Sequence, residues 1–112
     1  MRLGLRALRG FEADLHKLPT RKLQLVVLEL LSHIADGHLQ GRPLDKRVGI
    51  GDLSDCRKVY FDERPDHPRP NYRLVYRLLP TEVDAITVEA VSTGERYSLD
   101  AYIRAVNNLE RS

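Results

Sequence analysis

Two stretches decide the fold of this chain: CRKVYFD at residues 56–62 and NYRLVYRLL at residues 71–79. Both are rich in aromatic and β-branched residues, which suit a pleated, half-buried strand. Because side chains alternate between the two faces of a strand, Val59 and Phe61 point to one face and Lys58 and Tyr60 to the other. The pattern predicts a β-hairpin with one face in a core. The opposite face presents cations and phenols to an anionic ligand.

The segment between the two arms, residues 63–70, contains three prolines and is predicted to be an exposed, partly extended loop. After the hairpin, residues 84–92 alternate as a third strand, and residues 93–97 are expected to leave the sheet. One face of this strand carries Ile86, Val88 and Ala90. Because short connections favour antiparallel neighbours, the three strands are predicted to form an antiparallel sheet.

Two helices are predicted before the hairpin, over residues 9–17 and 21–36. Pro19 ends the first helix, Thr20 can cap the second, and Gly37 suits the left-handed residue that follows it. The apolar side of the first helix is formed by Phe11, Leu15 and Leu18. The stripe of the second helix is wider than one face and comprises Leu23, Leu25, Val26, Val27, Leu28, Leu30, Leu31 and Ile34. We interpret this helix as lying in a groove between the sheet and the first helix; the alternative is an apolar strip that binds a protein partner.

The remaining segments complete the predicted order (β)ααβββα. Residues 1–8 suit either a short strand or a ragged helix start, and residues 38–55 are predicted to be a loop. The loop residues expected to tuck inward are Leu39, Leu44, Ile50 and Leu53. Ser98 is expected to cap a final helix, whose apolar side is formed by Leu99, Ile103, Val106 and Leu109. The fold class is therefore α+β: one domain over residues 1–112, with a helical hairpin on a small antiparallel sheet of three to four strands, and a C-terminal helix.

Composition supports one packed domain. The 112 residues are 42% hydrophobic and 30% charged, which permits a core and disfavours disorder. No run is apolar and long enough to span a membrane, and none resembles a signal peptide, so a cytoplasmic protein with no membrane contact is expected. Cys56 is the only cysteine, which excludes an internal disulfide and predicts a buried thiol.

The net charge of +2 is unevenly distributed. Residues 37–77 hold nine Lys or Arg against six Asp or Glu, a net +3, whereas residues 78–112 hold three against six, a net −3. Solvated surface accounts for such segments as well as an anion site does. None of the four histidines is spaced with another His, Cys or carboxylate as a ligand pair, so neither a metal site nor a cofactor is predicted.

Basic and aromatic residues recur along the cationic face of the hairpin and after it. They are Lys58, Tyr60, Arg73, Arg96 and Tyr102. Adjacent strands bring such residues together across a sheet, and a segment leaving the third strand can return over the same face. Their convergence on one anion site is thus a geometric hypothesis. On residue types alone, solvated arginines and tyrosines packed at the rim remain the favoured explanation.

The same stretches resemble the RelE/ParE superfamily of bacterial toxins. The resemblance lies in NYRLVY at residues 71–76, in residues 88–91, in GER at 94–96 and in DAYIRA at 100–105. LSDCRKV at residues 53–59, and a helical hairpin that ends in Leu-Pro, resemble the RelE branch in particular. The similarity covers residues 9–110. It implies a metal-independent, ribosome-dependent endoribonuclease, the toxin of a type II toxin–antitoxin system. The implied partners are a cognate antitoxin, in a heteromeric toxin–antitoxin assembly, and the ribosome with its mRNA.

The resemblance also assigns residues. The catalytic positions of the family correspond to Lys58, Arg73, Arg96 and Tyr102. Its second lysine position is occupied here by Tyr60, which is a departure from the family. The candidates for substrate binding are Tyr60, Arg57 and Arg77.

These residue types suit cleavage of RNA by its own 2′-hydroxyl, which attacks the adjacent phosphate and leaves a 2′,3′-cyclic phosphate. The step needs a proton acceptor, a proton donor and positive charge at the pentavalent phosphorus. Arg73 and Arg96 supply charge and forked donors, and Lys58 is the candidate base if neighbouring arginines disfavour its charged form. Tyr102 is expected to orient the nucleophile or to stack on a base, and Tyr60 to stack.

Two other functions stay open. One is a ParE-like inhibitor of DNA gyrase without catalysis, against which the retention of four of the five catalytic positions argues. The other is a catalytically degenerate binding module of the same fold, which Tyr60 in place of the second lysine keeps open.

Overall fold

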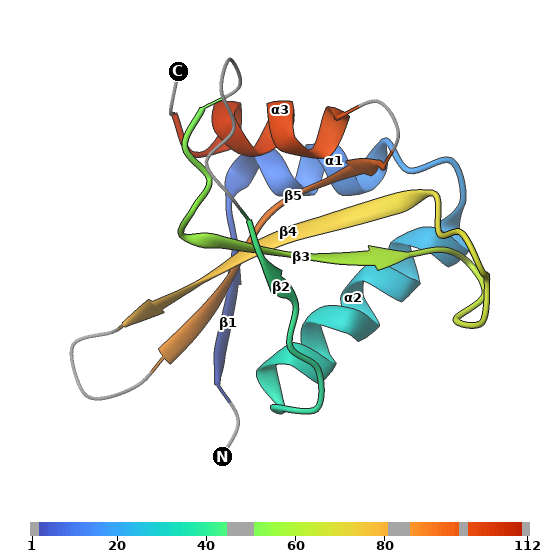
Figure 1. The fold of residues 1–112 in the computed structure, drawn as a ribbon, viewed down its shortest axis with the longest axis horizontal. Coiled ribbons are helices and arrows are strands. Elements are labelled where there is room, and N and C mark those ends of the chain that lie inside the picture. The colour runs from blue at the N-terminus through green and yellow to red at the C-terminus, as the bar shows by residue number, and fades with distance from the viewer. Residues whose placement is uncertain (1–2, 45–50, 81–85, 97–98, 111–112) are drawn as a thin grey trace.

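The computed structural model describes residues 3–44, 51–80, 86–96 and 99–110. Its elements, in chain order, are β1 (Gly4–Ala7), α1 (Arg9–His16), α2 (Arg21–Ala35), β2 (Arg42–Pro43), β3 (Cys56–Phe61), β4 (Tyr72–Pro80), β5 (Ile86–Glu95) and α3 (Asp100–Asn108). The predicted α+β class is confirmed, and Figure 1 shows the helices arranged around one twisted sheet. None of the described helices is long and apolar enough to cross a membrane.

The sheet has five strands in the order β1-β5-β4-β3-β2. Its centre is the predicted antiparallel meander of β3, β4 and β5. Each edge adds a strand beyond it: β1 lies parallel to β5, and the two residues of β2 pair with Lys58 and Arg57 of β3. The sheet is therefore mixed and has one strand more than expected. β2 lies in the predicted loop and contains Pro43, which an edge strand tolerates because its missing N–H faces away from the ladder.

β5 is longer than the sequence indicated. It continues to Glu95, whereas residues 93–97 were expected to leave the sheet at Thr93. Thr93, Gly94 and Glu95 instead pair with the first three residues of β4, after a β-bulge between Val75 and Tyr76. The expectation was wrong because β4 offers a full partner edge here, which outweighs the turn preference of Thr-Gly. Residues 84 and 85, the predicted beginning of this strand, lie outside the described residues.

The two faces of the sheet bury different cores. One core joins α1 and α2 to Phe61, Leu74 and Tyr76 of the hairpin. The other lies under α3 and includes Cys56 and Val75. Side chains alternate between the two faces along β3 and β4. The residues of both strands that neighbour Cys56 and Val75 on the second face are therefore available to a site beside α3. Leu44 and Leu53 are buried as predicted, while Ile50 lies outside the described residues.

The helix ends follow their sequence signals. The hydroxyl of Thr20 accepts a hydrogen bond from the N–H of Leu23 at 3.2 Å, and Gly37 has φ +81° after α2. The wide apolar stripe of α2 is only partly buried. Leu31 is buried, whereas Leu25 and Leu28 are 52% and 48% exposed. The interpretation of α2 as lying in a groove is thus correct for most of the stripe. Two leucines remain on the surface as an apolar strip.

The phase of α3 differs from the prediction. Leu99 and Ile103 are exposed, and Ala101, Tyr102 and Ala105 are buried in their place. Val106 is buried and Leu109 packs against the same core, as predicted. The reason is that small alanines allow α3 to approach β5 closely, so that the Tyr102 ring takes the core position. The N-cap position is Leu99, and the expected cap Ser98 lies outside the described residues.

A buried polar cluster fixes α3 to α1, and the two helices lie together at one end of the sheet (Figure 1). Asn108 donates a hydrogen bond to the carboxylate of Asp14 at 2.9 Å, and Arg104 lies 3.8 Å from the other carboxylate oxygen. Burial raises the pKa of Asp14, and it does so more strongly than Asn108 and Arg104 lower it. Arg104 also donates to the carbonyl of Thr93. These bonds determine where Tyr102 meets the sheet.

Gly41 has no space for a side chain, and we expect Gly41→Ala to destabilise the protein by about 1–3 kcal/mol through overpacking. A Cβ there would lie 2.6 Å from the Lys58 carbonyl oxygen. The N–H of Gly41 donates to the buried Tyr76 hydroxyl at 2.7 Å, and its carbonyl accepts from Arg57, so the backbone cannot retreat without losing both bonds. Urea unfolding measures the loss, with exposed Gln40→Ala as the control. An unchanged urea midpoint would mean that β2 can shift freely.

Candidate functional site

One row across the sheet carries the centre of the candidate site. Tyr60 of β3 pairs with Arg73 of β4, and Arg73 pairs with Gly94 of β5. Arg96 follows β5 directly and is held by its backbone N–H, which donates to the Asn71 carbonyl at 2.7 Å. Residues far apart in the sequence therefore meet at one end of three neighbouring strands.

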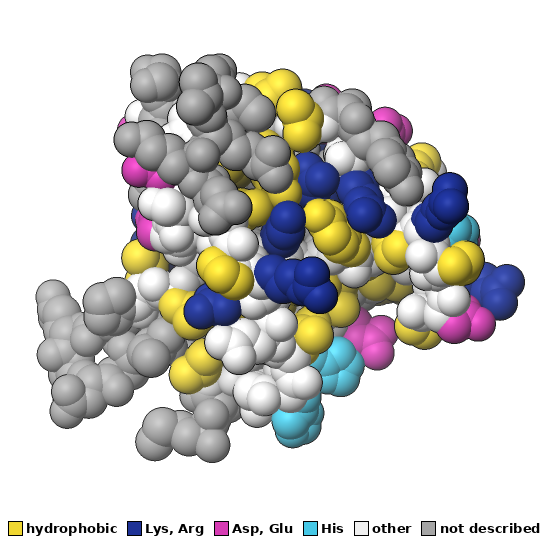
Figure 2. Space-filling model, viewed as in Figure 1, with side chains coloured by type: hydrophobic (Ala, Val, Ile, Leu, Met, Phe, Trp, Pro, Cys, Tyr) yellow, Lys and Arg dark blue, Asp and Glu magenta, His cyan; other side chains and the backbone are white. Residues whose placement is uncertain are grey.

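Tyr60 is the centre of a cluster of three cations. The Lys58 Nζ lies 5.3 Å from the centroid of its ring, the Arg73 Cζ 5.5 Å and the Arg96 Cζ 4.1 Å. Figure 2 shows Lys and Arg side chains gathered in the middle of the face that it views, over β3 and β4. Each contact has the geometry of a cation–π interaction. The geometric hypothesis of convergence is thus met by these residues.

Arg73 is the buried member of the cluster. It is only 5% exposed, and its Cζ lies 3.9 Å from the centroid of the Tyr102 ring. Among the described residues, neither its Nε nor one of its terminal nitrogens has a hydrogen-bond partner. Buried donors without partners are rare because each costs about 1–3 kcal/mol. Such an arrangement is typical of a group that is kept for a ligand.

The Tyr102 ring packs against the Arg73 guanidinium. Its ring is fully buried, so it offers no surface on which an RNA base could stack, in contrast to the expectation from the sequence. Its role in this geometry is to position the Arg73 guanidinium. Gly94 suits this packing, because a Cβ there would be in tight contact, at 3.0–3.2 Å, with atoms of Ala101, Arg104 and Asp100. The sequence reasoning missed Gly94, although a glycine within a strand is a signal of close approach.

The pKa values of the tyrosines on the two faces of the hairpin are shifted in opposite directions. Burial raises the pKa of Tyr60, but hydrogen bonding and charge from Lys58 and the charges of Arg73 and Arg96 together lower it below its usual value. On the other face, burial and the nearby carboxylates raise the pKa of Tyr72. The cationic face therefore favours a phenolate and the opposite face a neutral phenol.

Arg57 and Arg77, two candidates for substrate binding, lie outside the cluster. Arg57 donates to the Gly41 carbonyl at 2.9 Å, on the face of β3 opposite Tyr60. Arg77 donates from Nε to the buried Glu89 at 2.7 Å and lies 3.5 Å from Asp55. Both guanidinium groups have intramolecular partners, and neither is among the cations that face the Tyr60 ring.

The other sequence expectations concern single residues. Cys56 is buried, as predicted for a structural thiol. The four histidines, His16, His33, His38 and His67, are exposed. Within residues 3–44, 51–80, 86–96 and 99–110, no group of three His, Cys, Asp or Glu could hold a metal ion.

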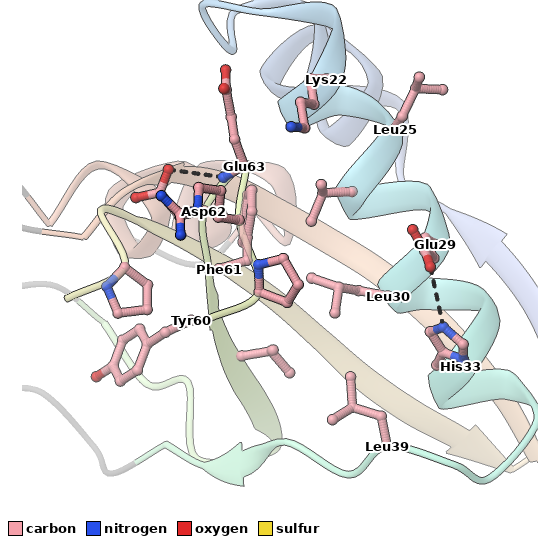
Figure 3. A pocket seen from close by; sticks show the side chains of 15 residues that line it. Lys22, Leu25, Glu29, Leu30, His33, Leu39, Tyr60, Phe61, Asp62 and Glu63 are labelled. Carbon is pink, nitrogen blue, oxygen red and sulfur yellow. Dashed lines mark hydrogen bonds and ion pairs between the residues drawn. The ribbon is translucent and has the colours of Figure 1, made fainter. Parts of the chain in front are cut away.

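A pocket of about 510 Å³ adjoins the cluster, between α2 and the end of β3 (Figure 3). Leu25 and Leu30 line it from α2, and Phe61 from β3. Tyr60 stands at its edge, and Figure 3 shows its side chain directed away from α2. The pocket and the cationic cluster are therefore neighbouring surfaces that share Tyr60.

The sequence matches no protein-family model and no curated protein. The structure is similar to a chain of the toxin–antitoxin complex RelBE2 from Mycobacterium tuberculosis. That chain is 26% identical, with a TM-score of 0.56 over 86% of this chain and 93% of that chain. It is also similar to the E. coli toxin RelE, solved in the free state as a double arginine-to-alanine mutant. That chain is 19% identical, with a TM-score of 0.58 over 97% of this chain and 99% of that chain. The chain thus has the RelE-like toxin fold that its sequence predicted.

Proposed function

We propose that this protein is the toxin of a toxin–antitoxin pair and cleaves mRNA on the ribosome without a metal ion. The observation that carries the proposal is the cluster around Tyr60, in which a buried arginine keeps donors without partners beside two further cations. Among ligands with forked oxygen acceptors, phosphate fits such a set best. The similarity to RelE and RelBE2 supports the toxin role.

The chemistry follows from the residues. The 2′-hydroxyl of the RNA attacks the adjacent phosphorus, and negative charge builds on the phosphoryl oxygens. Arg73 and Arg96 stabilise this charge, because cations that are already in place need no reorganisation during the reaction. Lys58, on the same strand face, supplies the third positive charge. Binding depends on the phosphate backbone, so it weakens as salt rises.

The partner of the proposed toxin is a protein antitoxin, as in the RelBE2 complex. The apolar strip of Leu25 and Leu28 and the adjoining pocket offer surface to such a partner. This surface meets the cationic cluster only at Tyr60, so an antitoxin that binds α2 blocks the site only if a further segment extends over Tyr60.

The Arg96→Ala variant tests the function. We expect primer extension on ribosome-bound mRNA to show cleavage by the wild type and about 100-fold slower cleavage by the variant, because one charge-stabilising donor is lost. Arg96 is partly exposed, so the fold should persist, as circular dichroism can verify. Arg9→Ala, an exposed arginine of α1, is the matched control.

Three outcomes contradict the proposal. Equal cleavage by wild type and Arg96→Ala excludes the cluster as the active site. Intact mRNA with the wild type, together with inhibited DNA supercoiling, favours the ParE-like alternative. Intact mRNA with unchanged supercoiling favours a binding module.

A further inference from the structure

The Tyr60 ring faces all three cations of the site. Lys58, Arg73 and Arg96 come from β3, β4 and the end of β5, and each faces the Tyr60 ring at 4.1–5.5 Å from its centroid. Three like charges around a neutral phenol repel one another. A phenolate would offset one of them. The cluster is thus built to hold a negative oxygen at this position.

Within the part of the chain that the structure describes, no acidic group is among those that shift the pKa of Tyr60. The groups that lower its pKa are Lys58, Arg73 and Arg96, and the opposing contribution is burial of the ring. α3 contributes Tyr102, which contacts Arg73. The charged groups that line the pocket come from α2 (Lys22, Glu29 and His33) and from the loop after β3 (Asp62, Glu63 and Arg64). The Tyr60 side chain is directed away from α2 (Figure 3).

We propose that Tyr60 is the general base of the cleavage reaction, and that its phenolate oxygen accepts the proton of the attacking 2′-hydroxyl. This inference rests on the proposed function and gives a specific role to the residue that departs from the resembling family. Tyr60 is partly exposed, so RNA can reach it.

The reaction balances with the residues of the cluster. The 2′-oxygen forms a bond to phosphorus, the bond from phosphorus to the 5′-oxygen breaks, and the 2′-proton passes to Tyr60. The Lys58 ammonium gives a proton to the departing 5′-oxygen. Because Lys58 and Tyr60 lie on the same strand face, the proton gained by Tyr60 then returns to Lys58, which restores the starting state.

Two variants that each lose one hydroxyl test the proposal. We expect Tyr60→Phe to slow single-turnover cleavage of ribosome-bound mRNA about 100-fold or more, the usual effect of a general base, with little change in substrate binding. In the wild type the rate rises with pH until Tyr60 is ionised, and this rise is lost in Tyr60→Phe. Tyr72→Phe, on the opposite face, keeps its ring contact with Phe61 and should cleave like the wild type.

A second measurement needs no RNA. Titration of the near-ultraviolet absorbance of tyrosinate, taken as the difference between wild type and Tyr60→Phe, gives the ionisation of Tyr60 alone. We expect it to precede the ionisation of Tyr72, obtained in the same way from Tyr72→Phe. If Tyr60 ionises together with Tyr72 or after it, the proposal is overturned.

The cleavage assay distinguishes failure of the role of Tyr60 from failure of the proposed function. If wild type and Tyr60→Phe cleave equally and with the same pH dependence, Tyr60 is not the base, while the proposed function stands. If the wild type leaves the mRNA intact, the function fails and the role of Tyr60 fails with it. Slow cleavage by Tyr60→Phe, combined with early ionisation of Tyr60, supports the proposal.

Discussion

The Arg73→Gln variant is expected to cleave mRNA about 1,000-fold more slowly than the wild type, as is typical when an arginine that stabilises phosphoryl charge is removed. Glutamine keeps much of the length and polarity of the side chain but loses the charge. Because Arg73 is 5% exposed, water cannot enter easily to replace the guanidinium. The loss should therefore exceed that of Arg96→Ala, whose site is partly exposed.

Arg73→Lys separates charge from geometry. The Arg73 guanidinium lies against the Tyr102 ring with its Cζ at 3.9 Å, and two of its nitrogens have no partner among the described residues. An ammonium keeps the charge but cannot stack as a plane or present a fork to two phosphate oxygens. Arg73→Gln loses transition-state stabilisation, and we expect Arg73→Lys to keep at most about a tenth of it, because a bidentate contact depends on both N–H bonds.

The measurement is single-turnover cleavage of ribosome-bound mRNA, with Arg21→Gln as a control that makes the same substitution at an exposed helix position. Full activity of Arg73→Lys would show that only charge matters. Full activity of Arg73→Gln would remove Arg73 from the site altogether. The unfolding midpoint should rise or stay constant in Arg73→Gln, because a buried, unpaired charge is removed.

The hairpin could be predicted because its information is local. Alternation in residues 56–62 and 71–79 assigns each side chain to a face without knowledge of any partner. The same holds for Thr20 and Gly37, whose effects depend on their own backbone neighbours. The direction of Lys58, Tyr60 and Arg73 toward one face follows from this local rule, together with antiparallel pairing.

The remaining features depend on partners that the sequence does not identify. β1 pairs with β5, and these strands lie about 80 residues apart in the chain, as in the pairing of Gly4 with Thr87. The side of α3 that faces the sheet is determined by the close approach at Gly94 and by the bonds from Asn108 and Arg104. It is not determined by the number of apolar residues on that side. Burial of Tyr102 follows from this orientation of α3. The sequence therefore offered the meeting of Lys58, Tyr60, Arg73 and Arg96 as a hypothesis, but it did not indicate that a buried Tyr102 ring contacts Arg73.

The partners of Arg77 could not be identified from the sequence either. Replacing Arg77 has the largest expected effect on stability. Glu89 is fully buried and pairs with Arg77 and with Arg6, whose side chain is 60% exposed. Arg77 is itself 19% exposed and also approaches Asp55. As a strand residue it resembles Arg73 in sequence, but its neighbours are carboxylates rather than tyrosines. Its charge therefore compensates a buried acid instead of remaining available for a ligand.

We expect Arg77→Met to lower the free energy of unfolding by about 3 kcal/mol, because it leaves a buried carboxylate with one exposed partner. The effect lies at the low end for broken buried pairs, since Arg6 remains. Adding Glu89→Leu should recover most of the loss, because the double variant replaces the pair with apolar groups of similar size. Urea unfolding of the two single variants and the double variant forms a complete cycle. If Arg77→Met unfolds at the wild-type midpoint, Arg6 alone compensates Glu89; if it is stable and yet fails to cleave mRNA, Arg77 belongs to the RNA site after all.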